Sequence, residues 1–117
     1  MNIRIIQIID KGIPNNERLW LKALRNLDLS HYVVINTNVL SNGNIMPYHR
    51  ECYWFPKKII SAGDTIVLYS RIGTDNEIVN KDGTKTHFFY WGNKSTLWGK
   101  VDSAAVVLEI TGWGTAK

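Results

Sequence analysis

The sequence predicts an all-β fold, an antiparallel sandwich of two sheets with about seven strands. Two observations carry this prediction. Apolar and polar residues alternate in several separate runs, which is the period of a half-buried strand. Turn-forming clusters separate these runs, and two of them, Asn42-Gly43 and Asp82-Gly83, are strong hairpin signals of the type I′ class.

The expected strands cover residues 3–9, 17–23, 32–35, 53–55, 65–69, 84–91 and 103–110. The isoleucines of 3–9 change parity after Ile5, which predicts a β-bulge or a strand that switches sheets. In 17–23, Leu19, Leu21 and Ala23 share one face, so this strand is expected to be half-buried. A helix over 17–29 is the alternative, although Asn26, Asp28 and Ser30 interrupt it early.

The remaining strands differ in how much of their surface they bury. Residues 32–35 and 65–69 are apolar on both faces, which predicts central strands that are covered on both sides or lie near a sandwich core. In 103–110 one face carries Ala104, Val106, Leu108 and Ile110. The polar stretch 71–83 predicts either a mobile loop or a long hairpin.

Composition sets the scale and excludes several classes of protein. The chain has 117 residues, 44% of them hydrophobic, which suits one domain over 1–117 with a real core. A single cysteine excludes an intramolecular disulfide framework and a cysteine-rich zinc module. The net charge of +4 permits an anionic partner without requiring one. Without a signal peptide or a membrane-spanning run, we expect a cytoplasmic protein with no membrane association.

Several segments resemble, in order, parts of the lamin tail domain family, whose fold is an immunoglobulin-like β-sandwich. They are Glu17–Lys22, Leu27–Ser30 before Tyr32-Val33-Val34, Tyr53–Pro56, Ile59–Leu68, Phe88–Asn93, Leu97-Trp98 and Val101–Leu108. The chain departs from the family at Val101, where a glycine is usual, and in the shortened loop 24–26. The resemblance implies a non-catalytic adaptor module that binds proteins, and some members of the family bind nucleic acid or chromatin.

No residue pattern in the sequence indicates a particular reaction or a bound metal. The sequence has no Walker loop, no G-x-S-x-G and no H-E-x-x-H. His49-x-x-Cys52 supplies two ligands where a zinc site needs three or four, and it lacks the third group that orients a nucleophile and its base. We therefore expect no enzyme activity, no cofactor and no metal.

The candidate partner-binding residues are Arg18, Trp20, Lys22, Lys57, Lys58, Lys94, Lys100 and Trp113. Trp20, between two cations on the outward face of one strand, could stack on a base or sugar, or be packed by its neighbours' aliphatic stems. The lysines form a phosphate-binding patch only if they converge, and otherwise a solvated surface. Trp113 lies beyond the last strand and is the better interface candidate.

These residues predict a binding module whose partner is a protein, docked on an exposed strand edge or on the loops at one end. Self-association into a homo-oligomer is possible by the same route. Two alternatives stay open: a nucleic-acid-binding module that uses the modest basic surface, and a carbohydrate-binding module.

Overall fold

The computed structural model describes residues 1–46 and 51–117. These residues form strands and one short 3-10 helix, so the all-β prediction is confirmed. In chain order the elements are β1 (Ile3–Ile9), β2 (Arg18–Ala23), β3 (Leu27–Asp28), η1 (Leu29–His31), β4 (Tyr32–Asn38), β5 (Cys52–Trp54), β6 (Ile59–Ile60), β7 (Thr65–Tyr69), β8 (Asn76–Val79), β9 (Lys85–Tyr90) and β10 (Ser103–Glu109).

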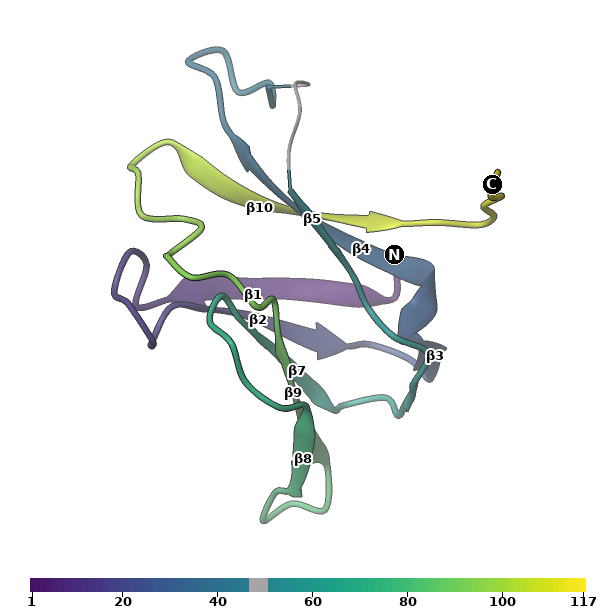
Figure 1. Cartoon of the computed structure of the whole chain (residues 1–117). Coiled ribbons are helices and arrows are strands. Elements are labelled where there is room, and N and C mark those ends of the chain that lie inside the picture. The colour runs from purple at the N-terminus through teal and green to yellow at the C-terminus, as the bar shows by residue number, and fades with distance from the viewer. Residues whose placement is uncertain (47–50) are drawn as a thin grey trace.

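The strands pair into a five-stranded sheet of order β1-β2-β7-β9-β8, a three-stranded sheet of order β10-β4-β5, and the small pair β3-β6. Figure 1 shows β10, β4 and β5 as a layer above β1 and β2. All named pairs are antiparallel except β7–β9, which is parallel. The expectation of antiparallel pairing throughout is wrong here, because the chain leaves β7, forms β8 outside it and returns as β9 between the two.

The described residues contain ten strands rather than the predicted seven. All seven expected strands are present, and the additions are β3, β6 and β8. Strands β3 and β6 have two residues each, too short to show any periodicity, and they exist because they pair with each other. Strand β8 lies inside the polar stretch 71–83, where pairing with β9 overrides weak local propensity. That stretch is therefore a long hairpin.

The hydrophobic core fills the space between the two sheets. From the five-stranded sheet it takes Leu19, Leu21, Ile66, Leu68 and Phe89, and from the three-stranded sheet Tyr32, Val34 and Val107. Trp98, on the loop before β10, is fully buried among them. The predicted buried face of β2 is confirmed, since Leu19, Leu21 and Ala23 are at most 1% exposed.

Two predictions about individual strands agree with the structure. The pairing of β1 with β2 shifts register between Ile5 and Gln7, which confirms the bulge. Strand β7 is buried on both faces, as expected. Strand β4 meets the other expectation, because its inward residues Tyr32 and Val34 lie in the core while its outward residues Val33 and Ile35 are only half-buried.

Both predicted hairpin turns are present, but the type I′ assignment is wrong. Only the glycines take positive φ, +85° at Gly43 and +88° at Gly83, whereas a type I′ turn needs two such residues. Each glycine instead closes a four-residue turn, with its N–H donating to Leu40 or Asn80. This is the pattern of a three-residue hairpin loop whose last residue is left-handed.

The β1–β2 turn packs directly against the loop before β10. Gly12 has φ +82°, and a Cβ added there would lie 3.1 Å from the Cα of Gly99. We expect Gly12→Ala to lower the free energy of unfolding by about 1–2 kcal/mol, because alanine is strained in this backbone conformation and has no room. Urea denaturation measures the change. Gly112→Ala is the control, since its Cβ would meet open space, and equal effects of the two variants would contradict the prediction.

Candidate functional site

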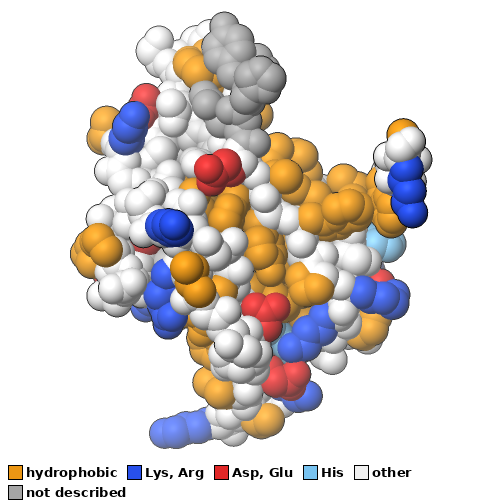
Figure 2. All heavy atoms as spheres, in the orientation of Figure 1, with side chains coloured by type: hydrophobic (Ala, Val, Ile, Leu, Met, Phe, Trp, Pro, Cys, Tyr) orange, Lys and Arg blue, Asp and Glu red, His pale blue; other side chains and the backbone are white. Residues whose placement is uncertain are grey.

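The outward face of the three-stranded sheet is a continuous apolar surface. Strand pairing places Val33 between Leu108 and Trp54, and Ile35 between Val106 and Cys52. Trp54 is 44% exposed and Leu108 is 40% exposed. Figure 2 shows hydrophobic side chains gathered along β10 and the segment after it. We call the six residues the open face: Val33, Ile35, Cys52, Trp54, Val106 and Leu108.

The segment after β10 extends the open face. Trp113, 69% exposed, packs edge-on against Trp54 with ring centroids 5.1 Å apart. The Trp54 indole N–H donates a hydrogen bond of 2.7 Å to the carbonyl of Ser30, and this bond holds the ring in place. The structure thus gives the interface candidate Trp113 an aromatic neighbour that the sequence analysis did not single out. The signal was the alternation in 53–55: Tyr53 and Phe55 face the core, so Trp54 faces outward.

Tyr53 illustrates the contrast between the two sides of β5. Its ring packs edge-on against Phe55 at 5.1 Å and lies 5.8 Å from the Trp91 ring. Burial, with a smaller contribution from the charge of Asp75, raises the pKa of Tyr53 to about 12. The inward side of β5 is therefore committed to the fold, which leaves the outward side for a partner.

The predicted platform of Arg18, Trp20 and Lys22 lies on the outward face of the five-stranded sheet. Trp20 pairs with Val67, which is only 2% exposed, and its own indole N–H is buried with no hydrogen-bond partner among residues 1–46 and 51–117. Arg18 hydrogen-bonds the carboxylate of Asp10 at 3.2 Å. Trp20 is thus half-buried rather than freely presented, as the packing alternative predicts.

Next to Trp20, two arginines cover stacked tyrosines. The rings of Tyr69 and Tyr90 stack at 5.3 Å with 9° between their planes. The Arg71 guanidinium lies 4.8 Å and 5.0 Å from their centroids, and Arg18 lies 5.6 Å from that of Tyr69. Gly73 approaches the ring of Tyr90 so closely that no side chain fits there. This side of the sheet is therefore already closed by its own residues.

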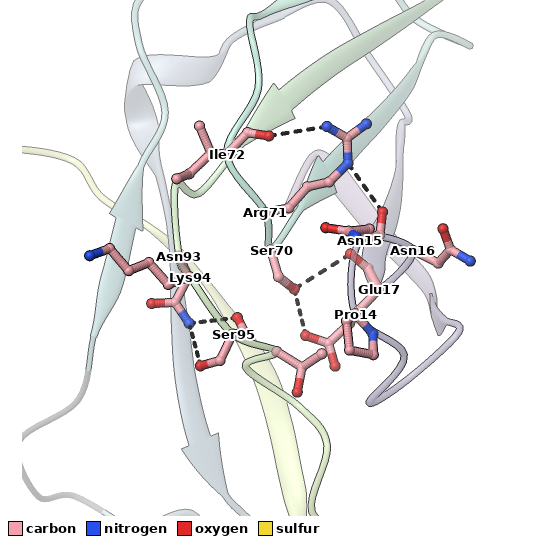
Figure 3. A pocket seen from close by; sticks show the side chains of 11 residues that line it. Pro14, Asn15, Asn16, Glu17, Ser70, Arg71, Ile72, Asn93, Lys94 and Ser95 are labelled. Atoms are coloured by element: carbon pink, nitrogen blue, oxygen red, sulfur yellow. Dashed lines mark hydrogen bonds between the residues drawn. The ribbon is translucent and has the colours of Figure 1, made fainter.

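A polar pocket of about 520 Å³ lies at one end of the sandwich, and the buried carboxylate of Glu17 forms its floor. Glu17 accepts hydrogen bonds from the N–H groups of Gly12, Leu97 and Trp98 and from the Ser70 hydroxyl, at 2.5–3.2 Å. Figure 3 shows Ser70 pointing at Glu17 below Arg71. Because the carboxylate is occupied by these donors, it ties three loops together.

Arg71 forms the upper wall of the same pocket. Its guanidinium donates to the carbonyls of Asn15 at 3.1 Å and Ile72 at 3.0 Å (Figure 3). Lys94 lines the other side. The Ser70 hydroxyl has a carboxylate as its acceptor, and the residues that line the pocket include no imidazole. The pocket therefore has polar groups that could hold a small polar ligand, but not a serine activated by histidine.

A second buried polar pair lies beneath the turn before β7. The Nε2 atom of His87 is 2.8 Å from an Asp64 carboxylate oxygen, and both side chains are at most 6% exposed. Burial raises the pKa of Asp64, but hydrogen bonds from the N–H groups of Lys85 and Ser61 and from His87 outweigh this, so the pKa lies below its usual value. The other ring nitrogen of His87 is buried without a partner among the described residues, so the pair holds no nucleophile.

The candidate lysines do not form one free basic patch. Lys57 pairs with Asp28 at 2.6 Å, and Lys58 pairs with Glu77 at 3.0 Å. These contacts lower the pKa values of the two acids. Hydrogen bonds from Lys57 and Ser30 hold the pKa of Asp28 well below its usual range. Hydrogen bonds from Lys85 and Lys58 lower the pKa of Glu77 to about 2. On the face seen in Figure 2, cationic side chains lie scattered among acidic ones.

The other candidates are separated as well. Lys94 lines the Glu17 pocket, whereas Lys100 lines a different one beside Asn36 and Thr37. In the two described ranges, no group of three or more His, Cys, Asp or Glu side chains could hold a metal. Cys52 is exposed on β5, and His49 lies outside the described residues.

No helix among residues 1–46 and 51–117 is long and apolar enough to cross a membrane. In comparisons with known proteins, neither a protein-family model nor a curated protein matches the chain.

We expect Glu17→Gln to lower the free energy of unfolding by roughly 2–4 kcal/mol. An amide in place of the carboxylate loses one acceptor and turns an N–H group toward the N–H groups of the loops. Urea denaturation at neutral pH measures the loss. Glu51→Gln, at an exposed glutamate, is the matched control, and a Glu17 variant as stable as that control would contradict the prediction.

The lowered pKa of Asp64 predicts that the folded protein loses stability in acid. Because its pKa is lowered in the folded state, the stability it contributes is fully present above about pH 4 and is lost as the pH falls through the folded-state pKa. Asp64→Asn should flatten the fall in unfolding free energy below pH 4, measured by denaturation across a pH series. Asp75→Asn, at an exposed loop position, should keep the wild-type slope, and parallel curves for all three proteins would disprove the assignment.

Proposed function

We propose that the chain is a non-catalytic binding module that takes a partner protein on the open face and on the free edge of β10. The observation that carries the proposal is an uncharged surface in which the exposed Cys52, Trp54 and Leu108 flank the half-buried Val33, Ile35 and Val106. Soluble domains rarely leave a contiguous apolar sheet face uncovered unless it binds something. Trp54 and Trp113 are residues of the type that dominates protein interfaces.

We further propose that the two facing sheets are an immunoglobulin-like sandwich of the lamin tail type. The mostly antiparallel pairing and the presence of all seven expected strands among the ten described support this proposal. The family resemblance also implies an adaptor role, which agrees with a partner-binding face. A reducing compartment such as the cytoplasm suits the single exposed thiol of Cys52.

The chemistry of the two polar sites supports a non-catalytic role. Ser70 donates to Glu17, which is held by backbone N–H groups, and the Asp64–His87 pair has no hydroxyl or thiol hydrogen-bonded to it in the described residues. Among the described residues, neither site has a hydroxyl or thiol that is hydrogen-bonded to an imidazole.

The two alternative ligands have weaker support. Nucleic acid would need free cations, and Arg18, Lys57 and Lys58 are already paired with carboxylates. Carbohydrate would need an open aromatic ring flanked by polar groups that can hydrogen-bond its hydroxyls, whereas Trp20 is half-buried and the exposed ring of Trp54 lies beside the apolar Val33. The open face is apolar and uncharged, and a surface of this kind suits a protein partner.

Capture from a nuclease-treated extract of the source cells tests the proposal. We expect immobilised wild-type chain to retain a set of proteins that the Leu108→Lys variant retains at least about tenfold less, because a charge must then be buried at the centre of the contact. Quantitative mass spectrometry measures retention. Val101→Lys, at a position 98% exposed and outside the open face, should behave as wild type, and identical profiles for all three would overturn the proposal.

A further inference from the structure

In the part of the chain that the structure describes, strand β10 has a free edge, and the backbone hydrogen-bonding groups on that edge can be assigned residue by residue. The carbonyl of Asp102 accepts from Val39, and the N–H of Ile110 donates to His31, so these two residues direct their backbone groups toward the β4 side. In an antiparallel strand, the N–H and C=O groups of one residue point to the same side, and this side alternates from residue to residue. The backbone N–H and C=O groups of the odd-numbered residues from 103 to 109 therefore point away from β4.

The first of these four residues is already satisfied. Ser103 donates its N–H to the Lys100 carbonyl, and its own carbonyl accepts from the Lys11 ammonium at 2.8 Å. The backbone groups of Ala105, Val107 and Glu109 face the outside of a strand that the described sheet leaves at its edge. Such an edge is a template for another strand, and natural edges are usually blocked by lysine, proline or a bulge. Residues 103–108 contain no charge and no proline.

We propose that the occupant of this edge is a second copy of the same chain, paired antiparallel through β10. The inference rests on the proposed function, because it names the partner that the open face and the β10 edge accept. A two-fold axis at Val107 places Val107 opposite its own copy and Ala105 opposite Glu109 of the second copy. Each of these pairs exchanges two backbone hydrogen bonds, so every free group on the edge finds a partner.

The same register joins the side chains. Leu108 comes to lie beside Val106 of the second copy, so the open faces merge into one apolar surface across the axis. No like charges meet along 103–108, which lets the strand oppose itself without repulsion. An isologous contact of this kind closes after two copies and does not grow into a fibre.

Charge complementarity at the two ends of the contact favours a second copy over an unrelated strand. Lys11 is held at the carbonyl of Ser103 and has no carboxylate partner among the described residues. Glu109 of the second copy lies opposite Ala105, two residues along the strand. Symmetry repeats this pairing of Lys11 with Glu109, so each end of the strand pair carries an ion pair.

Sedimentation velocity of the intact chain from about 1 to 500 µM should show a monomer–dimer equilibrium. Amide exchange by NMR over the same range locates the contact. We expect the N–H groups of Ala105, Val107 and Glu109 to become protected as concentration rises, while the β4-facing groups of Val106 and Leu108 are protected throughout. A dimer that leaves the exchange of the three edge amides unchanged would overturn the inference.

Charge reversal gives an independent measurement. Glu109→Lys and Lys11→Glu should each weaken the dimer at least about tenfold, and the double variant should recover most of the loss. Glu51→Lys makes the same charge change at an exposed residue away from the β10 edge and should leave the equilibrium unchanged. Circular dichroism checks that each variant is folded, and failure of the double variant to recover would also count against the inference.

The proposed function and this inference fail separately. A chain that is monomeric at every concentration, but whose protein capture still depends on Leu108, overturns the second copy and leaves the binding module standing. A dimer with protected edge amides whose extract-capture profile is the same for wild type and Leu108→Lys supports the inference and removes the proposed docking of other proteins.

Discussion

The buried carboxylate of Glu17 holds one end of the sandwich together. It accepts hydrogen bonds from Gly12 in the β1–β2 turn, from Ser70 after β7, and from Leu97 and Trp98 before β10. These segments are far apart in the sequence, and the last of them carries Trp98 into the core. Because a polar group buried this deeply is tolerable only when its hydrogen-bonding sites are filled, the Glu17 side chain requires the three loops to meet in one arrangement. That arrangement sets where β10 begins, and so where its free edge lies.

The parts of the fold that follow from periodicity could be predicted, and the parts that depend on tertiary partners could not. The seven predicted strands and the β1 bulge follow from local sequence patterns. Strands β3 and β6 have no pattern because they are made only by their mutual pairing. Glu17 itself shares the parity of Leu19 and Leu21, so the sequence did carry a signal that it faces the core. Its partners lie up to 81 residues away, and no local rule supplies them.

The candidate site shows the same limit. Sequence alternation correctly places Arg18, Trp20 and Lys22 on one outward face, but alternation does not say what covers that face. Arg71, Tyr69 and Tyr90 come from later strands and loops and close it. Similarly, Lys57 and Lys58 are adjacent in the sequence, whereas their acidic partners lie on β3 and β8, two of the strands that had no periodic signal. Two lysines that the sequence predicted to belong to a basic patch are thus held in separate local ion pairs in the structure.

The two outward sheet faces of the sandwich differ in how far the domain's own residues cover them. This contrast supports the open face as the place where a partner binds. On the five-stranded sheet, guanidinium groups lie over the tyrosine rings and Val67 is buried, so a partner would have to displace contacts the domain makes with itself. On the three-stranded sheet, no described element lies over Val33 and Ile35, and the exposed rings of Trp54 and Trp113 pack only edge-on against each other. Burying the second surface costs no existing ion pair and releases water from apolar atoms, so association there has the larger driving force.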